Sequence, residues 1–433
     1  MEYSYNERLE ADFTRIAPIF AWNPQPMPYL GLDFGSSGAR ACVIDDADTP
    51  HHHGQVAFSA AHNTADWRAA LFELLAGIPA NLRASLQALA INGTSGTVLL
   101  TDADFEPLLP AVLYNDPRAH AMDLPCAQEM DLPSALAKAE WLRQRAPTAR
   151  HFFHQADWLA TLLTGQPGVC DYHNALKTGF DVVNWRWPAS LDDHPMRALL
   201  PEVLAPGTKI APISRVLARH FSLNPACIVR AGTTDSIAAF IAAGVREPGV
   251  AVSSLGTTLV LKLLSTAPVD APEFGVYSHK FGHLWLAGGA SNAGGGVLRQ
   301  FFSDAALAAL SARIDPTQTS LLNYLPLPCP GERFPVNDPH LLPRLMPRPA
   351  DDAAFLHGLL ESLARIEAQG YARLVELGAT PLHAVVSAGG GAKNLVWQQI
   401  RERVLGVPVS VASHTDAAFG SARLARLGEA LLP

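Results

Sequence analysis

Residues 30–40 (LGLDFGSSGAR) are the part of this sequence whose residue types and spacing indicate chemistry most directly. A short apolar strand leads into a Gly-Ser-Ser-Gly turn, and a second β-rich segment follows at residues 41–44. We expect a β-hairpin in which Gly35 and Gly38 adopt the positive φ of a tight turn. Backbone amides that point into such a turn can bind a phosphate group.

Three side chains of this hairpin could assist phosphate binding. Ser36 and Ser37 would add hydroxyl donors beside the backbone amides. Asp33 would place a carboxylate where a divalent cation that bridges two phosphates could bind through water. An ordinary β-hairpin with a glycine turn would show the same pattern, so both interpretations stay open for this segment alone.

A second segment repeats the pattern. Residues 251–262 (AVSSLGTTLVLK) predict a strand, a turn that contains Gly256, Thr257 and Thr258, and a returning strand. The repetition indicates that the chain is internally duplicated.

A third glycine-rich segment, residues 388–394 (AGGGAKN), follows an apolar strand at 384–386 and precedes a helix that should begin near Leu395. This arrangement directs the amides at the start of the helix toward an anion or a flat ring. Two phosphate hairpins and one nucleotide loop between a strand and a helix together describe the actin-like ATPase architecture.

The chain resembles the FGGY carbohydrate kinases, and within them the small D-ribulose kinases of cyanobacteria and plants. The resemblance runs from about Tyr29 to the C-terminus, through the motifs LGLDFGSSGAR, INGTSGTVLL, QADWL, DYHNALKTGF, AGTTDSIAAF, SSLGTTLVLKLL, YSHK, GGASNAGGG, GERFP and AGGGAKNLVWQQ. It implies an α/β, actin-like ATPase fold of the ribonuclease H type. Two duplicated domains would lie on either side of a cleft: residues 28–245 with the sugar and phosphate hairpin, and residues 246–433 with the nucleotide site.

Local patterns agree with this organisation. A polar linker with turn residues at 246–249 divides the two halves. We expect helices at 67–75, 135–145 and 355–377. The proline-rich segment 325–349 should form an extended loop, since prolines disfavour helices and central strands.

Asp235 is the candidate catalytic residue. It follows a strand-like segment at 228–231 and a Gly-Thr-Thr turn, and a helix should start at Ser236. The positive end of that helix dipole would keep the carboxylate ionised at neutral pH. In the resemblance, Asp235 holds the position of the general base, which accepts the proton of the sugar hydroxyl as that hydroxyl attacks the phosphoryl group. A residue that only caps its helix would look the same locally.

The resemblance implies further contacts, residue by residue. The sugar would contact Asp33, Ser37, Ser95, Asp235 and Ser236. ATP would contact Gly35, Ser36, Ser37, Arg40, Gly256, Thr257, Gly294, Gly390, Gly391, Asn394 and Trp397. Asp33 would hold Mg²⁺ through water, Asn394 would hydrogen-bond the adenine edge, and Trp397 would either flank adenine or serve as a core aromatic.

The sugar side departs from the larger xylulose kinases. They carry a GQMHG segment where this chain has residues 92–96 (NGTSG), so Ser95 stands at the position of the histidine. A hydroxyl cannot reproduce the reach of an imidazole, so the sugar should bind in a different pose. Asp116 and Arg118 of the family's Trp-x-Asp-x-Arg pattern are retained. A further polar cluster either lines the ketose site or satisfies a loop: Tyr172, His173, Asn174 and Lys177.

Composition restricts the remaining possibilities. The 433 residues are 48% hydrophobic with a formal net charge of −8, which disfavours a general nucleic-acid binder. No apolar run reaches the roughly 18 residues of a membrane span, and residues 1–27 lack the apolar block of a secretory signal. Five scattered cysteines without a CxxC pair indicate neither disulfides nor a zinc site. We therefore expect a cytoplasmic protein with no nucleic-acid or membrane partner. The resemblance implies a small-molecule ketose substrate, bound by a monomer or homodimer.

Two other patterns carry no function in this interpretation. Residues 51–53 (HHH) follow a Thr-Pro pair in a polar stretch and should form a solvated loop. Neither GxxxxGK[ST] nor GxGxxG occurs in the sequence, which excludes a P-loop and a Rossmann site.

Two classes of function stay open. The first is an ATP-dependent kinase that converts D-ribulose to D-ribulose 5-phosphate, with D-xylulose, L-ribulose and glycerol as alternative substrates. The second is a non-catalytic actin-like ATPase in which the nucleotide only switches domain closure. Asp235 favours the kinase, because a switch needs no base beside an acceptor hydroxyl.

Overall fold

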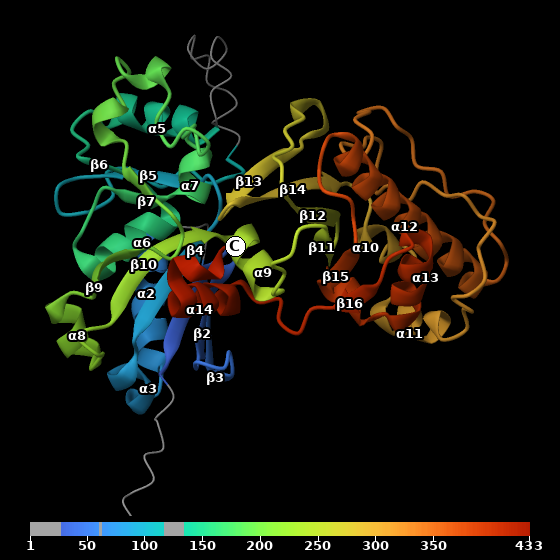
Figure 1. Ribbon diagram of the computed structural model, residues 1–433, viewed down its shortest axis with the longest axis horizontal. Coiled ribbons are helices and arrows are strands. Elements are labelled where there is room, and N and C mark those ends of the chain that lie inside the picture. The colour runs from blue at the N-terminus through green and yellow to red at the C-terminus, as the bar shows by residue number, and fades with distance from the viewer. Residues whose placement is uncertain (1–26, 60–62, 117–133) are drawn as a thin grey trace, which may run out of the picture.

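The computed structural model describes residues 27–59, 63–116 and 134–433, which form two lobes, each built around a six-stranded sheet (Figure 1). The first sheet has the spatial order β3 (Pro50–Ala57), β2 (Gly38–Ile44), β1 (Tyr29–Phe34), β4 (Ala88–Gly93), β10 (Ile228–Thr234) and β9 (Lys209–Pro212). The second sheet has the spatial order β13 (Tyr277–Phe281), β14 (Leu284–Ser291), β12 (Leu259–Ser265), β11 (Val250–Leu255), β15 (Ala384–Ala388) and β16 (Val409–Val411).

The two sheets share one topology. In the first sheet, β1 pairs antiparallel with β2 and parallel with β4. In the second sheet, β11 pairs antiparallel with β12 and parallel with β15. The predicted internal duplication is therefore confirmed. Strands β1 and β4 are buried along almost their whole length, as expected for central strands of a sheet that is covered on both faces.

Helices cover both sheets. In chain order they are α2 (Thr64–Gly77), α3 (Ala80–Ser85), α5 (Ser134–Arg145), α6 (Gln155–Thr164), α7 (Tyr172–Leu176), α8 (Arg215–Phe221), α9 (Asp235–Ala242), α10 (Gly295–Leu298), α11 (Asp304–Ser311), α12 (Asp352–Glu376), α13 (Leu395–Leu405) and α14 (Ala417–Leu427). We call the first sheet with helices α2 to α9 and α14 the first lobe, and the second sheet with helices α10 to α13 the second lobe. Two pairs of short strands complete the first lobe: β5 (Val98–Thr101) with β6 (His151–His154), and β7 (Val169–Asp171) with β8 (Glu202–Leu204).

The helices expected at 67–75, 135–145 and 355–377 are confirmed as α2, α5 and α12. Segment 325–349 lies outside the helices and strands, so the prediction of an extended loop is also confirmed. The solvated loop predicted at residues 51–53 is wrong, because these residues belong to the edge strand β3. Their side chains alternate between exposed and half-buried positions, because one face of β3 lies toward α2.

Helix α14 packs on the first sheet, although it comes from the end of the chain. Figure 1 shows it, in red, among the blue strands of the first lobe. Small residues permit this close approach: a Cβ atom added at Gly31 of β1 would overlap the backbone of Ala418, and one added at Gly420 would overlap the backbone of Ala238 on α9. The predicted division after residue 245 groups α14 with the second half of the chain, whereas its packing partners lie in the first lobe.

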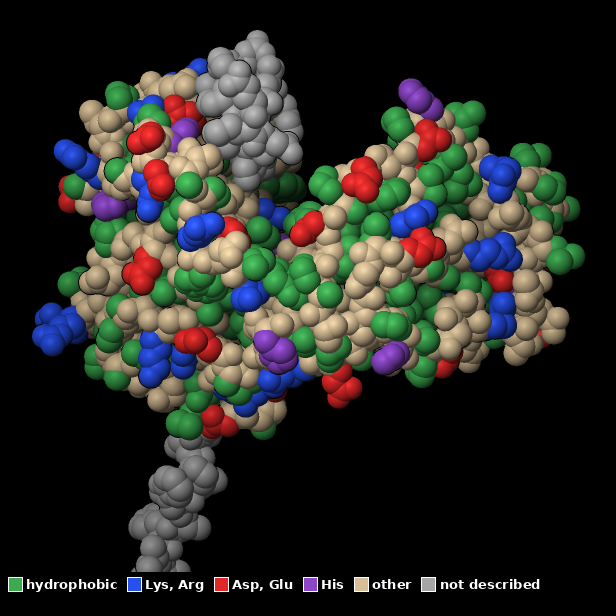
Figure 2. All heavy atoms as spheres, turned by 45° about the horizontal axis from the view of Figure 1, so that its top comes forward, with side chains coloured by type: hydrophobic (Ala, Val, Ile, Leu, Met, Phe, Trp, Pro, Cys, Tyr) green, Lys and Arg blue, Asp and Glu red, His purple; other side chains and the backbone are tan. Residues whose placement is uncertain are grey.

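The face drawn in Figure 2 carries acidic and basic side chains interspersed, and its surface is hollowed between the two lobes. Within the described part of the chain, no helix is both long enough and apolar enough to cross a membrane. Three of the described cysteines are buried free thiols, and Cys329 is exposed.

Candidate active site

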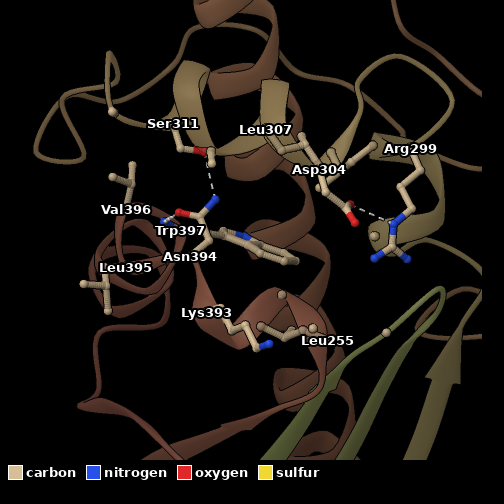
Figure 3. Close-up of a pocket in the computed structure, with 17 residues that line it drawn as sticks. Leu255, Arg299, Asp304, Leu307, Ser311, Lys393, Asn394, Leu395, Val396 and Trp397 are labelled. Atoms are coloured by element: carbon tan, nitrogen blue, oxygen red, sulfur yellow. Dashed lines mark hydrogen bonds and ion pairs between the residues drawn. The ribbon is translucent and has the colours of Figure 1, made fainter.

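A cavity of about 570 Å³ lies in the second lobe, between the turn after β15, the start of α13 and helix α11 (Figure 3). It is lined by Leu255, Gly256, Gly295, Leu298, Arg299, Asp304, Leu307, Ala308, Ser311, Ala312, Gly390, Gly391, Lys393, Asn394, Leu395, Val396 and Trp397. Five residues that the sequence assigned to ATP lie together here: Gly256, Gly390, Gly391, Asn394 and Trp397. A mostly apolar cavity of this size can accommodate a nucleoside.

Two neighbouring glycines of the turn after β15 have different roles. A Cβ atom at Gly391 would lie 2.5 Å from the indole of Trp397 and 2.8 Å from Cβ of Leu255, so glycine is needed for the indole to pack under the turn. A Cβ atom at Gly390 would meet no other protein atom within 4 Å. Gly390 therefore leaves open space in the cavity, whereas Gly391 allows close packing inside the protein.

Asn394 and Trp397 are largely engaged within the protein. Asn394 is the N-cap of α13: its Oδ1 accepts a hydrogen bond from the backbone amide of Trp397 (3.0 Å), and its Nδ2 donates to Oγ of Ser311 on α11 (2.9 Å; Figure 3). One Nδ2 hydrogen and one lone pair of Oδ1 remain for the predicted contact with adenine. Trp397 is 3% exposed and belongs to the apolar core of the second lobe, so its packing is that of a core aromatic whose ring borders the cavity.

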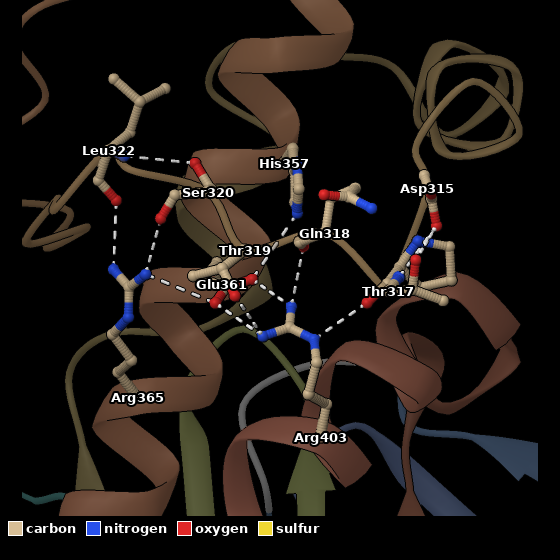
Figure 4. Close-up of polar contacts among 11 residues, drawn as sticks. Asp315, Thr317, Gln318, Thr319, Ser320, Leu322, His357, Glu361, Arg365 and Arg403 are labelled. Carbon is tan, nitrogen blue, oxygen red and sulfur yellow. Dashed lines mark hydrogen bonds and ion pairs between the residues drawn. The ribbon is translucent and has the colours of Figure 1, made fainter.

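A polar network binds the segment that follows α11 to helices α12 and α13 (Figure 4). Arg403 on α13 donates to Oε2 of Glu361 on α12 (2.6 Å) and to the backbone carbonyl of Gln318 (3.1 Å), in the segment that follows α11. Arg365 donates to the backbone carbonyl of Ser320 (2.8 Å). These bonds fix the segment after α11 to the two helices that lie on either side of it in the network, α12 and α13.

The β11–β12 hairpin forms the remaining edge of this cavity. The amide of Gly295 donates to the carbonyl of Gly256 (2.9 Å), and the amide of Gly296 donates to the carbonyl of Thr257 (3.0 Å). A Cβ atom at Gly294 would lie 2.6 Å from the carbonyl oxygen of Thr257. The three residues that the sequence assigned to this side, Gly256, Thr257 and Gly294, are therefore brought together.

The β1–β2 hairpin forms as predicted, but its glycines are needed for another reason. The amide of Gly35 donates to the carbonyl of Gly38 (3.0 Å), and neither glycine adopts the expected left-handed conformation. Glycine is required at position 38 because a Cβ atom there would lie 2.5 Å from the carbonyl oxygen of Val56 on β3. Ser36 and Ser37 are exposed at the tip of the hairpin, where a ligand could reach their hydroxyl groups.

Asp33 lies in β1 and is only 4% exposed. Burial raises its pKa to about 7, and the negative charges of Asp235 and Asp416 add to this effect. Arg40 opposes the shift only in part, since its guanidinium lies 3.4 Å from Oδ2 of Asp33 and is itself half exposed. Three carboxyl groups thus lie near a single arginine beside the β1–β2 hairpin, which leaves an excess of negative charge there.

A second cavity, of about 200 Å³, lies between the lobes. It is lined by Thr94, Ser95, Tyr114, Lys177, Asp235 and Ser236 of the first lobe and by Tyr277 and His279 of β13 in the second lobe. Three of the predicted sugar residues, Ser95, Asp235 and Ser236, lie together in this cavity, whereas Asp33 and Ser37 are outside its lining. The cavity is small and polar, as a sugar site requires.

Asp235 is positioned by strand β10, which runs directly into helix α9. The predicted Gly-Thr-Thr turn is wrong, because these residues continue the strand with a register shift against β4. A Cβ atom at Gly232 would overlap the carbonyl oxygen of Ile91, so glycine allows β10 to lie against β4. Thr234 is the N-cap of α9, and Asp235 is the first residue of the helix.

The carboxyl group of Asp235 is held in a partly buried, mixed-charge environment. Its Oδ1 accepts a hydrogen bond from the amide of Ser236 (2.6 Å). Burial nevertheless raises its pKa above the ordinary value, against the lowering effects of this amide, Lys262 and Lys177. Desolvation therefore outweighs the expected stabilisation by the helix start. A carboxylate with a raised pKa is the stronger proton acceptor.

Side chains from both lobes meet around Asp235. Nζ of Lys262, on β12 of the second lobe, donates to the carbonyl of Ser236 in the first lobe, and burial lowers the pKa of this lysine to about 8. Nζ of Lys177, at the end of α7 in the first lobe, donates to the hydroxyl of Tyr277 (2.8 Å) and lies 4.0 Å from the centre of that ring. Each lobe thus contributes one ammonium group near the carboxylate.

The structure separates the members of the polar cluster around α7. Lys177 lines the smaller cavity. Tyr172 accepts a hydrogen bond from the amide of Gly282 (3.2 Å), and the side chain of Asn174 donates to Asp171 (2.6 Å). Those two residues, together with His173, are buried and bonded within the protein. Arg118, retained from the family pattern, lies outside the described residues.

The second lobe contributes three residues to the smaller cavity and its border that were not singled out from the sequence: Lys262, Tyr277 and His279. All three come from the second lobe. The motif SSLGTTLVLKLL contains Lys262, and YSHK contains the other two, so the resemblance marked these positions without assigning them a role.

Comparisons with known proteins show similarity to carbohydrate kinases. Residues 251–428 match the FGGY family of carbohydrate kinases, C-terminal domain. The chain is 28% identical to a xylulose kinase of Streptomyces coelicolor, over 91% of this chain and 86% of that protein. It is 27% identical to an autoinducer-2 kinase of Yersinia enterocolitica, over 71% of this chain but only 63% of the length of that relative.

Solved structures extend the similarity to both lobes. A xyloylose kinase from Brucella ovis superposes with a TM-score of 0.81 and 25% identity, over 93% of this chain and 90% of that one. Glycerol kinase of Plasmodium falciparum with ADP superposes with a TM-score of 0.79 over 94% of this chain and 90% of that one, and its 17% identity shows the fold alone. The predicted two-lobed, actin-like α/β fold is confirmed.

Proposed function

Because these similarities support assignment to the FGGY family of carbohydrate kinases, we propose that this chain is an ATP-dependent kinase that phosphorylates D-ribulose at its terminal hydroxyl, giving D-ribulose 5-phosphate. The observation that carries this proposal is the position of Asp235, which lines a small polar cavity between the lobes. The larger cavity of the second lobe would hold the adenosine part of ATP.

In the proposed reaction, Asp235 accepts the proton of the terminal sugar hydroxyl. The oxygen of that hydroxyl forms a bond to the terminal phosphorus of ATP, the bond from this phosphorus to its bridging oxygen breaks, and ADP leaves. The exposed hydroxyl groups of Ser36 and Ser37 and the amides of the β1–β2 hairpin would bind the transferred phosphoryl group. The two lobes exclude water, which would otherwise accept the phosphoryl group.

The residues around Asp33 suit a divalent cation. Asp33 is a buried carboxyl group whose pKa is raised by burial and by two neighbouring carboxyl groups, so a cation would relieve an excess of negative charge. Oxygen ligands are also the ligands that Mg²⁺ prefers. Asp33 would hold the ion, which would supply neutralisation of charge on the phosphate groups.

D-Xylulose is the second candidate substrate, because a relative that aligns with 91% of this chain is a xylulose kinase. D-Ribulose is favoured by Ser95, which lines the smaller cavity and which, in the resemblance, stands at the position of a histidine of xylulose kinases. A nucleotide switch without catalysis is disfavoured by the same cavity, since a switch needs no base in a sugar-sized pocket.

Purified protein with MgATP, assayed for ADP release and sugar phosphate across D-ribulose, D-xylulose, L-ribulose and glycerol, tests the proposal. We expect the highest kcat/KM with D-ribulose. A higher kcat/KM with D-xylulose would overturn the substrate assignment and leave the kinase assignment intact. Absence of phosphorylated product from every compound, in a protein that binds ATP, would contradict both.

A further inference from the structure

His279 is a buried histidine that the proposed reaction does not use. It lies on β13 of the second lobe, is 8% exposed and lines the cavity of about 200 Å³ that also contains Asp235. Its ring packs near the rings of Tyr277 (5.0 Å between centroids) and His173 (5.9 Å). Within the described part of the chain, no hydrogen bond joins its ring nitrogens to another protein group, and these nitrogens are not among the fully enclosed polar atoms that lack a partner.

The neighbouring His173 is also buried, and both of its ring nitrogens have hydrogen-bond partners, as is usual for a buried imidazole. Its Nδ1 is 2.8 Å from Oγ1 of Thr233, and its Nε2 is 2.7 Å from the carbonyl oxygen of Lys280, so both nitrogens are satisfied. Leaving a buried polar group without a partner costs about 1–3 kcal/mol. The ring nitrogens of His279 have no such partner in the protein, but His279 lines the cavity, where a bound molecule can supply one.

The charge state of His279 restricts what that molecule is. Burial lowers its pKa well below the usual value, and the positive charges of Lys177 and Lys262 and the neighbouring His173 lower it further. The ring is therefore neutral near pH 7 and offers one donor and one acceptor. This pair of functions matches a hydroxyl group, which also donates and accepts, better than it matches an anion.

We propose that His279 binds a hydroxyl group of the sugar from the second lobe, across the cavity from Ser95 and Asp235 of the first lobe. This assignment rests on the proposed function. Ser95 and Asp235 line the first-lobe side of the same cavity. A sugar held by both sides bridges the lobes, so sugar binding favours the arrangement in which Lys262 reaches the helix that begins at Asp235.

Steady-state kinetics of His279→Ala provide the test, with His283→Ala as the matched control. His283 is an exposed histidine in the turn of the same β13–β14 hairpin and is not part of the cavity lining. For His279→Ala we expect the KM for D-ribulose to rise roughly 10-fold or more, as for loss of a hydrogen bond to a buried group. The KM for ATP should change less than about twofold, and the control should match the wild type in both constants.

A second variant, His279→Asn, keeps one donor and one acceptor near the position of Nδ1 and should recover part of the sugar affinity. Sugar KM values within about twofold of the wild type in both variants would overturn the assignment. An equal rise of both KM values would also overturn it, since that result indicates a packing role. If the wild type phosphorylates a sugar and both variants keep the KM of the wild type for that sugar, only the assignment of His279 fails. If the wild type phosphorylates no sugar, the proposed function fails and the assignment of His279 fails with it.

Discussion

The two cavities are built in different ways. The larger one lies within the second lobe and is shaped by glycine-rich backbone and apolar side chains, with Gly391 packed against Trp397. The smaller one lies between the lobes and is lined mainly by polar and aromatic side chains, among them Asp235, Lys177 and His279. Backbone shape defines the first cavity, whereas the relative position of the lobes defines the second.

Because the cavities differ in this way, we expect nucleotide binding to depend on the second lobe alone and the chemical step to depend on both lobes. A preformed, mostly apolar cavity can hold a flat ring whatever the state of the other lobe. The smaller cavity needs Lys262 and β13 of the second lobe beside Asp235 of the first. Changes in the larger cavity should therefore alter nucleotide affinity and local packing, and changes in the smaller cavity should alter sugar affinity and turnover.

The largest effect is expected for Asp235→Asn. Removal of the general base should lower kcat for sugar phosphorylation on the order of 100-fold or more. Nucleotide affinity should stay close to that of the wild type, because Asp235 lies outside the lining of the larger cavity. Turnover can be measured by coupled ADP release, and nucleotide binding by calorimetry. Near-normal turnover would exclude Asp235 as the base.

Gly391→Ala and Gly390→Ala form a matched pair in the larger cavity. The new methyl group at position 391 would lie 2.5 Å from Trp397, so we expect a loss of stability of about 1–3 kcal/mol and weaker ATP binding. The methyl group at position 390 meets no protein atom within 4 Å, so stability should be unchanged. Thermal unfolding without ligand distinguishes the two variants, and equal stability would contradict the packing described for Gly391.

Lys262→Met tests the contribution of the second lobe to the smaller cavity. Loss of its bond to the carbonyl of Ser236 and of its charge near Asp235 should lower kcat roughly 10-fold. The KM for ATP should change little, because Lys262 is not part of the larger cavity. Lys280→Met is the control, since the ammonium of Lys280 lies over the ring of Trp285 (5.1 Å). Equal losses in the two variants would contradict a specific role for Lys262.

The smallest effect concerns Asp33 and pH. Its pKa is about 7 in the folded protein, against an ordinary value of 3.8. As pH rises between these values, the unfolded chain loses a proton that the folded protein keeps, so the stability of the wild type falls. The Asp33→Asn variant lacks this titration and does not lose stability in this way. In buffer without Mg²⁺, its free energy of unfolding relative to that of the wild type should therefore rise between pH 5 and pH 8 by on the order of 1–2 kcal/mol. Urea unfolding at both pH values measures this difference, and a pH-independent difference would show that Asp33 is already ionised.

Much of the fold and of the larger cavity could be predicted from the sequence because their signals are local. The motif AGGGAKN contains its own strand end, turn and helix start, and β15 and α13 follow it as expected. The hairpins at Ser36 and Gly256 are equally local. The conformations of Gly35 and Gly38 were predicted wrongly, because the need for glycine at position 38 comes from β3, a strand outside the turn.

The smaller cavity was predicted only in part, for a physical reason. Ser95, Asp235 and Ser236 follow strands of the first sheet, so their motifs place them at one edge. Lys262 and His279 belong to strands of the second sheet, and only the packing of the lobes brings them near Asp235. The raised pKa of Asp235 could not be predicted for a related reason, since burial depends on the whole fold whereas the helix dipole is visible locally.

A structure of the protein with Mg²⁺, a non-hydrolysable ATP analogue and D-ribulose would test the central claim most directly. We expect the adenosine part in the cavity beside Gly390 and Gly391, and the terminal hydroxyl of the sugar within hydrogen-bonding distance of Asp235. A sugar bound away from Asp235, with its terminal hydroxyl turned from the nucleotide phosphates, would contradict the account.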